Sequence, residues 1–190
     1  MKRALPGLVL LAGCLAMCSA GAAPQEAVFV DDGEAKLVQQ LRKPWKHADG
    51  YLEGSGYNNY LQGGMAIGPG DFHVTVELTI LKLRRSAASL RIGERSHFGF
   101  EGGGGHVFVQ GPLFGPKTVL LRPNDGVVPE EKRFTFEVAR SGSELEFLVG
   151  SQVIHKMKCG SGVLGPIALR PWRSTMRVYR FAATGNLIEL

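Results

Sequence analysis

Two glutamates, Glu144 and Glu146, have the spacing of a catalytic carboxylate pair. Residues two apart on a strand point to the same face of a sheet, where two carboxyl groups can perform acid–base chemistry on a glycosidic bond. The next position on that face is Leu148, so the row of acids does not continue. We therefore interpret the pair as a solvated strand edge rather than an active site.

Other acids can be placed on outer strand faces by the same alternation. Along residues 72–80 the apolar side chains share one face, which leaves Glu77 on the other face. Glu101, Glu137 and His97 occupy similar positions in their own segments. A sugar-cleaving enzyme would use such carboxylates together with His97 as general acid and base, so these four residues are the catalytic candidates.

Aromatic and cationic side chains favour a binding surface instead. Sugar ligands suit faces on which aromatic rings stack on the pyranose while charged and amide groups bond its hydroxyls. Residues 170–173 and 56–60 combine these groups. Two alternatives need no ligand: a surface of salt bridges, and a turn at 58–59 after which Tyr60 and Leu61 pack inward. The predicted ligand-binding residues are Arg91, His97, Glu101, His106, Arg170, Trp172, Tyr57 and Asn58.

Four consecutive glycines, residues 102–105, raise the alternative of a phosphate-binding loop. Such a loop is completed by a helix N-terminus and a Lys-Ser or Lys-Thr pair. The alternating segment 106–110 follows the glycines instead. We therefore predict a connection between two strands, in which glycine also permits close approach of a bulky ligand.

Metal and nucleic-acid sites have weak support. The five histidines lack the i, i+4 spacing and the cysteine pairs of zinc sites. Residues 31–34, Asp-Asp-Gly-Glu, offer oxygen ligands for calcium without the alternating acids of a dedicated calcium loop. The net charge of +5 comes with no basic block longer than residues 82–85, which argues against a nucleic-acid partner. We predict no cofactor, with calcium at 31–34 as the alternative.

The elements that must position these residues are short strands. Segments of alternating polarity recur between turns rich in glycine and proline, and residues 34–41 fit either a short helix or a strand. Many short strands without helical crossovers predict an all-β fold, a jelly-roll β-sandwich of two antiparallel sheets. The expected strands are 72–80, 89–92, 97–100, 106–110, 118–122, 133–139, 144–149, 152–156, 167–170 and 176–181.

The first 23 residues have the layout of a bacterial export signal. A basic start precedes an apolar stretch that is too short for a membrane-spanning helix, and small residues follow it. Cleavage after Ala22 or Ala23 would release a soluble protein. Residues 11–14, Leu-Ala-Gly-Cys, also have the form of a lipobox, in which Cys14 would carry a lipid anchor. Both routes predict a periplasmic, extracellular or outer-envelope location.

The expected organisation is a signal peptide at 1–23, a β-sandwich at 25–185 and a C-terminal tail at 186–190. After ordinary signal cleavage Cys159 is the only remaining cysteine, which excludes an intrachain disulfide. Stability must then come from the apolar core.

Several motifs in the order of these strands resemble a known superfamily. Residues 45–52 fit W-x-x-x-D-G-x-L, residues 70–74 resemble x-D-F-x-L with Val74 at its last position, and residues 165–171 begin with a match to G-x-I-x-L-Q/R. Over about residues 28–185 the chain is similar to the concanavalin A-like lectin/glucanase superfamily, in particular to 3-keto-disaccharide hydrolase (DUF1080)-like domains and to the N-terminal module of planctomycete-type sialidases. It departs from their pattern at Ser86-Ala87-Ala88, where N-S-G is usual, and at Gly150-Ser151, where N-G is usual.

The resemblance implies a concanavalin A-like sandwich. Together with the outward aromatic and charged residues, it leads us to predict a module that binds carbohydrate or another extracellular ligand without catalysis of its own. The alternatives are a glycoside hydrolase or lyase of the keto-disaccharide type and an envelope module that binds other proteins. The ligand, the partner protein and the oligomeric state stay open.

Overall fold

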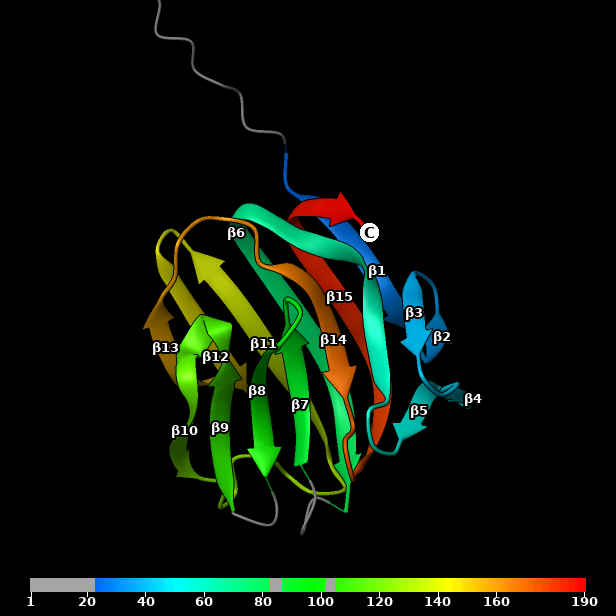
Figure 1. Cartoon of the computed structure of the whole chain (residues 1–190). Helices are drawn as coiled ribbons and strands as arrows, with labels where there is room; N and C mark the ends of the chain where they lie inside the picture. The colour runs from blue at the N-terminus through cyan, green and yellow to red at the C-terminus, as the bar shows by residue number, and fades with distance from the viewer. Residues whose placement is uncertain (1–22, 83–86, 102–104) are drawn as a thin grey trace, which may run out of the picture.

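The computed structural model describes residues 23–82, 87–101 and 105–190 (Figure 1). These ranges form antiparallel strands and one 3-10 turn, η1, at Pro112–Phe114. Within these ranges no helix is long and apolar enough to cross a membrane. The strands are β1 Gln25–Asp31, β2 Glu34–Ala35, β3 Val38–Leu41, β4 Lys46–Ala48, β5 Tyr51–Ser55, β6 Tyr60–Leu81, β7 Ala87–Ile92, β8 Ser96–Glu101, β9 His106–Gly111, β10 Gly115–Pro123, β11 Arg133–Ser141, β12 Glu144–Val149, β13 Gln152–Lys158, β14 Gly165–Arg170 and β15 Thr175–Glu189.

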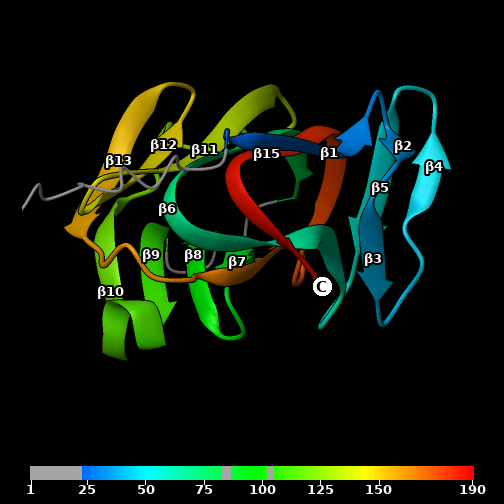
Figure 2. The same ribbon diagram turned by 90° about the horizontal axis from the view of Figure 1, so that it is seen from above.

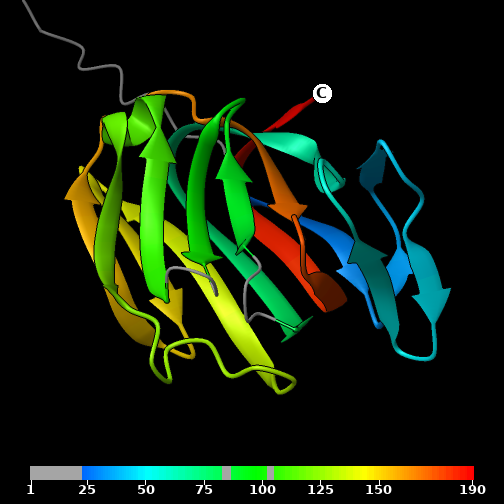
Figure 3. The same cartoon turned by 60° about the horizontal axis from the view of Figure 1, so that its bottom comes forward.

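Two layers of strands pack face to face (Figure 2). The front sheet has the order β10-β9-β8-β7-β14-β6, with β3 beside β6. The back sheet runs β13-β12-β11-β6-β15-β1, with β5 paired to the first part of β15. The short strands β2–β5 lie together at one side of the sandwich (Figure 3). The predicted two-sheet all-β sandwich is confirmed, and residues 34–41 form strands β2 and β3 rather than a helix.

Strand β6 belongs to both sheets. Its first part, residues 60–67, pairs with β3 and β14, whereas residues 72–79 pair with β11. The bend between the two parts is held by Arg140 of β11, whose side chain is 2% exposed. The Arg140 guanidinium donates to the carbonyl oxygens of Gly68 and Gly70 at 2.9 and 2.6 Å, and to those of Gly160 and Gly162 at 3.0 and 2.8 Å. One buried cation thus fastens the bend to the loop before β14.

Aromatic rings join the two sheets through the core. Phe98 of β8 lies parallel to Phe147 of β12, with ring centroids 4.6 Å apart, and its centroid is 5.2 Å from that of Phe136 in β11. Fully burying a side chain of this size contributes about 1.5–3 kcal/mol. Because strand residues alternate between faces, fixing Phe98 inward fixes His97 and Gly99 on the outer face of the front sheet.

The C-terminal residues are part of the sandwich. We expected a tail at 186–190, but β15 continues to Glu189. Leu187 is 6% exposed and pairs with Ile67 of β6, so burial of its apolar side chain holds the end of the chain in place. The expected boundary at residue 185 is therefore wrong.

The motif at 45–52 and the departure at Gly150-Ser151 both have structural roles. Trp45 is buried over Gly54 of the hairpin β4–β5, and its indole N–H donates to Asn59 Oδ1 at 3.2 Å. Gly150 and Ser151 form the two-residue turn of the hairpin β12–β13, with φ of 54° and 67°. Positive φ at both positions suits the right-handed twist of the flanking strands. The pair Gly150-Ser151 therefore forms the hairpin turn in place of the usual Asn-Gly pair.

Candidate ligand-binding site

The outer face of the front sheet carries a row of polar side chains. In register across the strands stand Gln62 of β6, Ala168 of β14, Arg91 of β7 and His97 of β8. The small side chain of Ala168 separates Gln62 from Arg91 and leaves room above it. The Arg91 guanidinium reaches across this gap and donates to Gln62 Oε1, and Gln62 Nε2 donates in turn to Gln39 Oε1 at 3.1 Å.

A second network lies two residues along the strands, on the same face. Arg170 Nε donates to Ser89 Oγ at 3.0 Å, and Ser89 Oγ lies 3.2 Å from His97 Nδ1. Because the serine oxygen already accepts from Arg170, its hydroxyl proton is free to be donated to an unprotonated Nδ1. The network therefore suits a neutral His97 with its proton on Nε2.

His97 is neutral for electrostatic reasons as well. Burial, followed by the positive charges of Arg170 and Arg91, lowers the pKa of His97 from 6.5 to about 3. Burial also lowers the pKa of both arginines, which keep their charge at neutral pH. The result is two partly desolvated cations near an uncharged imidazole.

Tyr60 completes this cluster, which we call the Arg91–Arg170 patch. The Arg91 guanidinium lies 4.8 Å from the centroid of the Tyr60 ring, and Arg91 Nε is buried without a hydrogen-bond partner. A buried N–H without a partner costs about 1–3 kcal/mol. The protein therefore leaves part of this guanidinium unsatisfied. The patch consists of Tyr60, Gln62, Ser89, Arg91, His97 and Arg170.

Two further aromatic rings extend the patch beyond the end of β14. Trp172 lies over the Arg170 guanidinium at 4.3 Å, and its ring centroid is 4.1 Å from that of Tyr57. Trp172 has a φ of 56°, which is uncommon for a bulky residue. Strained backbone of this kind occurs often where a side chain must be aimed at a ligand. Tyr57 is 54% exposed, so this end of the patch offers an open aromatic surface.

Phe108 of β9 borders the patch on the other side of His97. Gly99 of β8 pairs with Phe108, and a Cβ at Gly99 would lie 2.5 Å from the phenylalanine ring. Glycine is therefore required for the ring to lie across β8. His106, two residues before Phe108 on the same face of β9, is half-buried.

Two of the three predicted catalytic acids, Glu77 and Glu137, lie far from His97. Glu77 binds Arg133 at 2.5 Å and Glu137 binds His73 at 2.7 Å, and both pairs lie on the outer face of the back sheet. The apolar core separates these acids from His97. Glu101 belongs to β8, where its backbone pairs with His106, but its side chain lies outside the described residues.

The other residues singled out in the sequence analysis are located as follows. Asn58 is exposed in the turn before β6 with a φ of 56°, next to Tyr57. Glu144 and Glu146 both bind Lys156, as a solvated strand face would. The glycines at 102–105 lie between the antiparallel strands β8 and β9, although 102–104 are outside the described residues. Cys14 is also outside them.

The segment proposed for calcium is engaged by cations. Asp31 binds Arg180 at 2.9 Å and Glu34 binds Lys36 at 2.7 Å. Within the described ranges no group of three or more His, Cys, Asp or Glu side chains is arranged to hold a metal ion.

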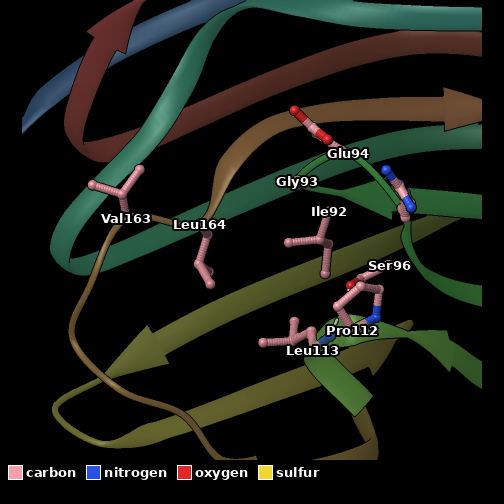
Figure 4. A pocket seen from close by; sticks show the side chains of 9 residues that line it. Ile92, Gly93, Glu94, Ser96, Pro112, Leu113, Val163 and Leu164 are labelled. Carbon is pink, nitrogen blue, oxygen red and sulfur yellow. Dashed lines mark hydrogen bonds between the residues drawn. The ribbon is translucent and has the colours of Figure 1, made fainter. Parts of the chain in front are cut away.

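A cavity of about 400 Å³ lies beside the turn between β7 and β8 (Figure 4). Ile92, Leu113 and Leu164 point toward its interior, and Glu94 stands at its rim. The side chain of Ile92 points away from the outer face that carries Arg91, so this cavity is separate from the Arg91–Arg170 patch.

Comparison with known proteins identifies the architecture. No family model matches the chain, and no curated protein matches it. Among solved structures, Trypanosoma rangeli sialidase in complex with sialic acid aligns with a TM-score of 0.60 and 9% identity over 86% of this chain and 31% of the sialidase. The Crh5 transglycosylase in complex with NAG aligns with a TM-score of 0.59 and 11% identity over 87% and 84% of the two chains. Caenorhabditis elegans galectin LEC-6 aligns with a TM-score of 0.51 and 13% identity over 70% and 96%.

The chain has the concanavalin A-like fold. Sequence reasoning missed three members of the patch on this sandwich: Tyr60, Gln62 and Ser89. Neighbouring glycines interrupt the alternation in the first part of β6, which hid the outward position of Gln62. Tyr60 faces outward while Leu61 faces the core, so the alternative in which both pack inward is wrong for Tyr60.

Proposed function

We propose that this concanavalin A-like sandwich is an exported, non-catalytic module that binds carbohydrate on the outer face of its front sheet. One observation carries the proposal: the Arg91–Arg170 patch gathers hydrogen-bonding side chains, one of them incompletely satisfied, beside the exposed ring of Tyr57 and the half-buried ring of Trp172. Sugar ligands need this combination, because their hydroxyls require donors and acceptors while their apolar faces stack on aromatic rings.

The fold neighbours support the same class of ligand. These neighbours include a galectin, a transglycosylase in complex with NAG and a sialidase in complex with sialic acid. These likenesses concern fold, so the ligand class rests on the patch itself.

A hydrolase or lyase of the keto-disaccharide type is the second candidate, favoured by the motifs at 45–52 and 165–171. Against it, Glu77 and Glu137 are engaged in ion pairs on the back sheet. An acid there has no access to a substrate held beside His97. Incubation of the wild-type protein with a panel of oligosaccharides, followed by chromatography, is expected to release no product.

Binding is tested with a glycan panel and two matched variants. Trp172→Ala removes the half-buried ring beside Arg170 and should weaken binding about tenfold. Tyr179→Ala removes a ring that lies under Arg133 on the back sheet, 4.0 Å from its guanidinium, and should leave affinity unchanged. Full affinity in Trp172→Ala would contradict this site. A protein that ignores every glycan but captures an envelope protein would be an interaction module instead.

Export and lipidation are tested separately. Mass spectrometry of the mature protein should find its N-terminus after Ala22 or Ala23, or a lipidated Cys14. An intact N-terminus at Met1 on the cell-associated protein would contradict export.

A further inference from the structure

The arginines of the two outer faces differ in their partners. On the back sheet Arg133 binds Glu77, Arg177 binds Glu53 and Arg180 binds Asp31. On the front sheet Arg91 and Arg170 form no ion pair with a described acid, and their hydrogen bonds go to neutral groups. The aromatic contacts are similar, since Arg91 lies over Tyr60 as Arg133 lies over Tyr179. Arg91 and Arg170 therefore lack the directly bound carboxylate that these back-sheet arginines have.

The two unpaired arginines are also the more desolvated ones. Arg170 is 7% exposed, and burial lowers its pKa and that of Arg91. By contrast, hydrogen bonds to Glu77 and Glu53 raise the pKa of Arg133 and Arg177. A cation removed from water without a counter-charge is costly, and a bound anion offsets that cost. Neutral hydroxyl groups would bond the guanidinium but would not neutralise it.

His97 favours the same ligand. A neutral imidazole in the patch can donate from Nε2 without adding a third positive charge to the two arginines. Among the described acids, Glu94 favours the charged form of Arg91 without forming an ion pair with it. Neither arginine therefore has a directly bound carboxylate among the described side chains.

We propose that the Arg91–Arg170 patch selects glycans whose sugars carry a carboxylate, with Arg91 as the main contact and Arg170 as the second positive charge. This inference rests on the proposed function and names its ligand class. A planar guanidinium matches a carboxylate in shape as well as in charge, so the proposal applies to uronate-containing chains and to sialylated glycans alike.

The experiment compares each acid with its own ester. The probes are oligogalacturonate, oligomannuronate and sialyllactose, each beside its methyl ester, which keeps the sugar backbone and removes the charge. At least one acid should bind about tenfold or more tightly than its ester, as expected for a charge-assisted hydrogen bond. The probe that binds distinguishes uronate from sialate.

Two variants locate the effect. Arg91→Gln should reduce the preference for acid over ester to less than about threefold, whereas Arg133→Gln on the back sheet should keep it. Circular dichroism and a thermal melt establish that both variants are folded, and Arg91→Lys, which keeps the charge without the planar fork, should retain part of the preference.

The outcomes separate the two proposals. Equal affinity for acid and ester overturns the carboxylate inference while leaving carbohydrate binding intact. Binding of no probe and of no neutral glycan overturns both. A preference lost equally in Arg91→Gln and Arg133→Gln would reflect the overall positive charge, and would also overturn the inference.

Discussion

His97 should make the stability of this protein depend on pH below neutrality. Its pKa is about 3 in the folded protein, compared with 6.5 for an ordinary histidine. In the unfolded chain His97 binds a proton as the pH falls below 6.5, whereas in the folded protein it stays neutral. The unfolded state therefore binds more protons over this window, and stability falls as the pH falls from 6.5 toward 3.

The size of the effect follows from this difference in pKa. Each pH unit below 6.5 costs about 1.4 kcal/mol of unfolding free energy, so about 2 kcal/mol is lost between pH 7 and pH 5. His97 is 6% exposed, so solvent screening reduces this figure little. Out of a total of about 5–15 kcal/mol for a folded domain, the loss is large enough to measure.

Urea unfolding at pH 7 and pH 5 measures it, with His97→Asn as the comparison. Asparagine offers an oxygen near the place of Nδ1, which can accept from Ser89, but it does not titrate. The variant should lose about 2 kcal/mol less than the wild type over this interval, since all other titrating groups are common to both proteins. Equal losses in the two proteins would refute a neutral, desolvated His97.

Four other substitutions, one of them a control, test the packing and the site. Arg140→Met should destabilise the protein by about 3 kcal/mol or more in urea unfolding, because four carbonyl oxygens lose their buried donor. Gly54→Ala should cost about 1–3 kcal/mol, since its methyl group would lie 2.3 Å from the Trp45 ring. Gly162→Ala, which meets open space, is the control for Gly54→Ala and should change stability little. Glu137→Gln should leave glycan affinity unchanged in titration calorimetry, and a loss of affinity would place ligand on the back sheet.

Local patterns were enough to predict the strands with regular alternation. Residues 72–80 lie within β6, and their inward side chains are those of the predicted apolar face. The hairpin at Gly150-Ser151 was also readable, because two adjacent turn residues between alternating segments leave few other conformations. The first part of β6 was missed, because its glycines remove the side chains on which alternation depends. The C-terminal strand was cut short, because the pairing of Leu187 depends on a segment more than a hundred residues away in the sequence.

The sequence by itself determined which side chains point inward and which point outward along most strands, since alternation is a property of the extended backbone. It did not determine which outward side chains meet. Arg91 and Glu137 both point outward, but β7 lies in the front sheet and β11 in the back sheet, with the core between them. Gln62, Arg91 and Arg170 come from distant parts of the chain, and only the order β8-β7-β14-β6 brings them together. That order is decided by long-range strand pairing and by the bend in β6, for which no local spacing is a signal.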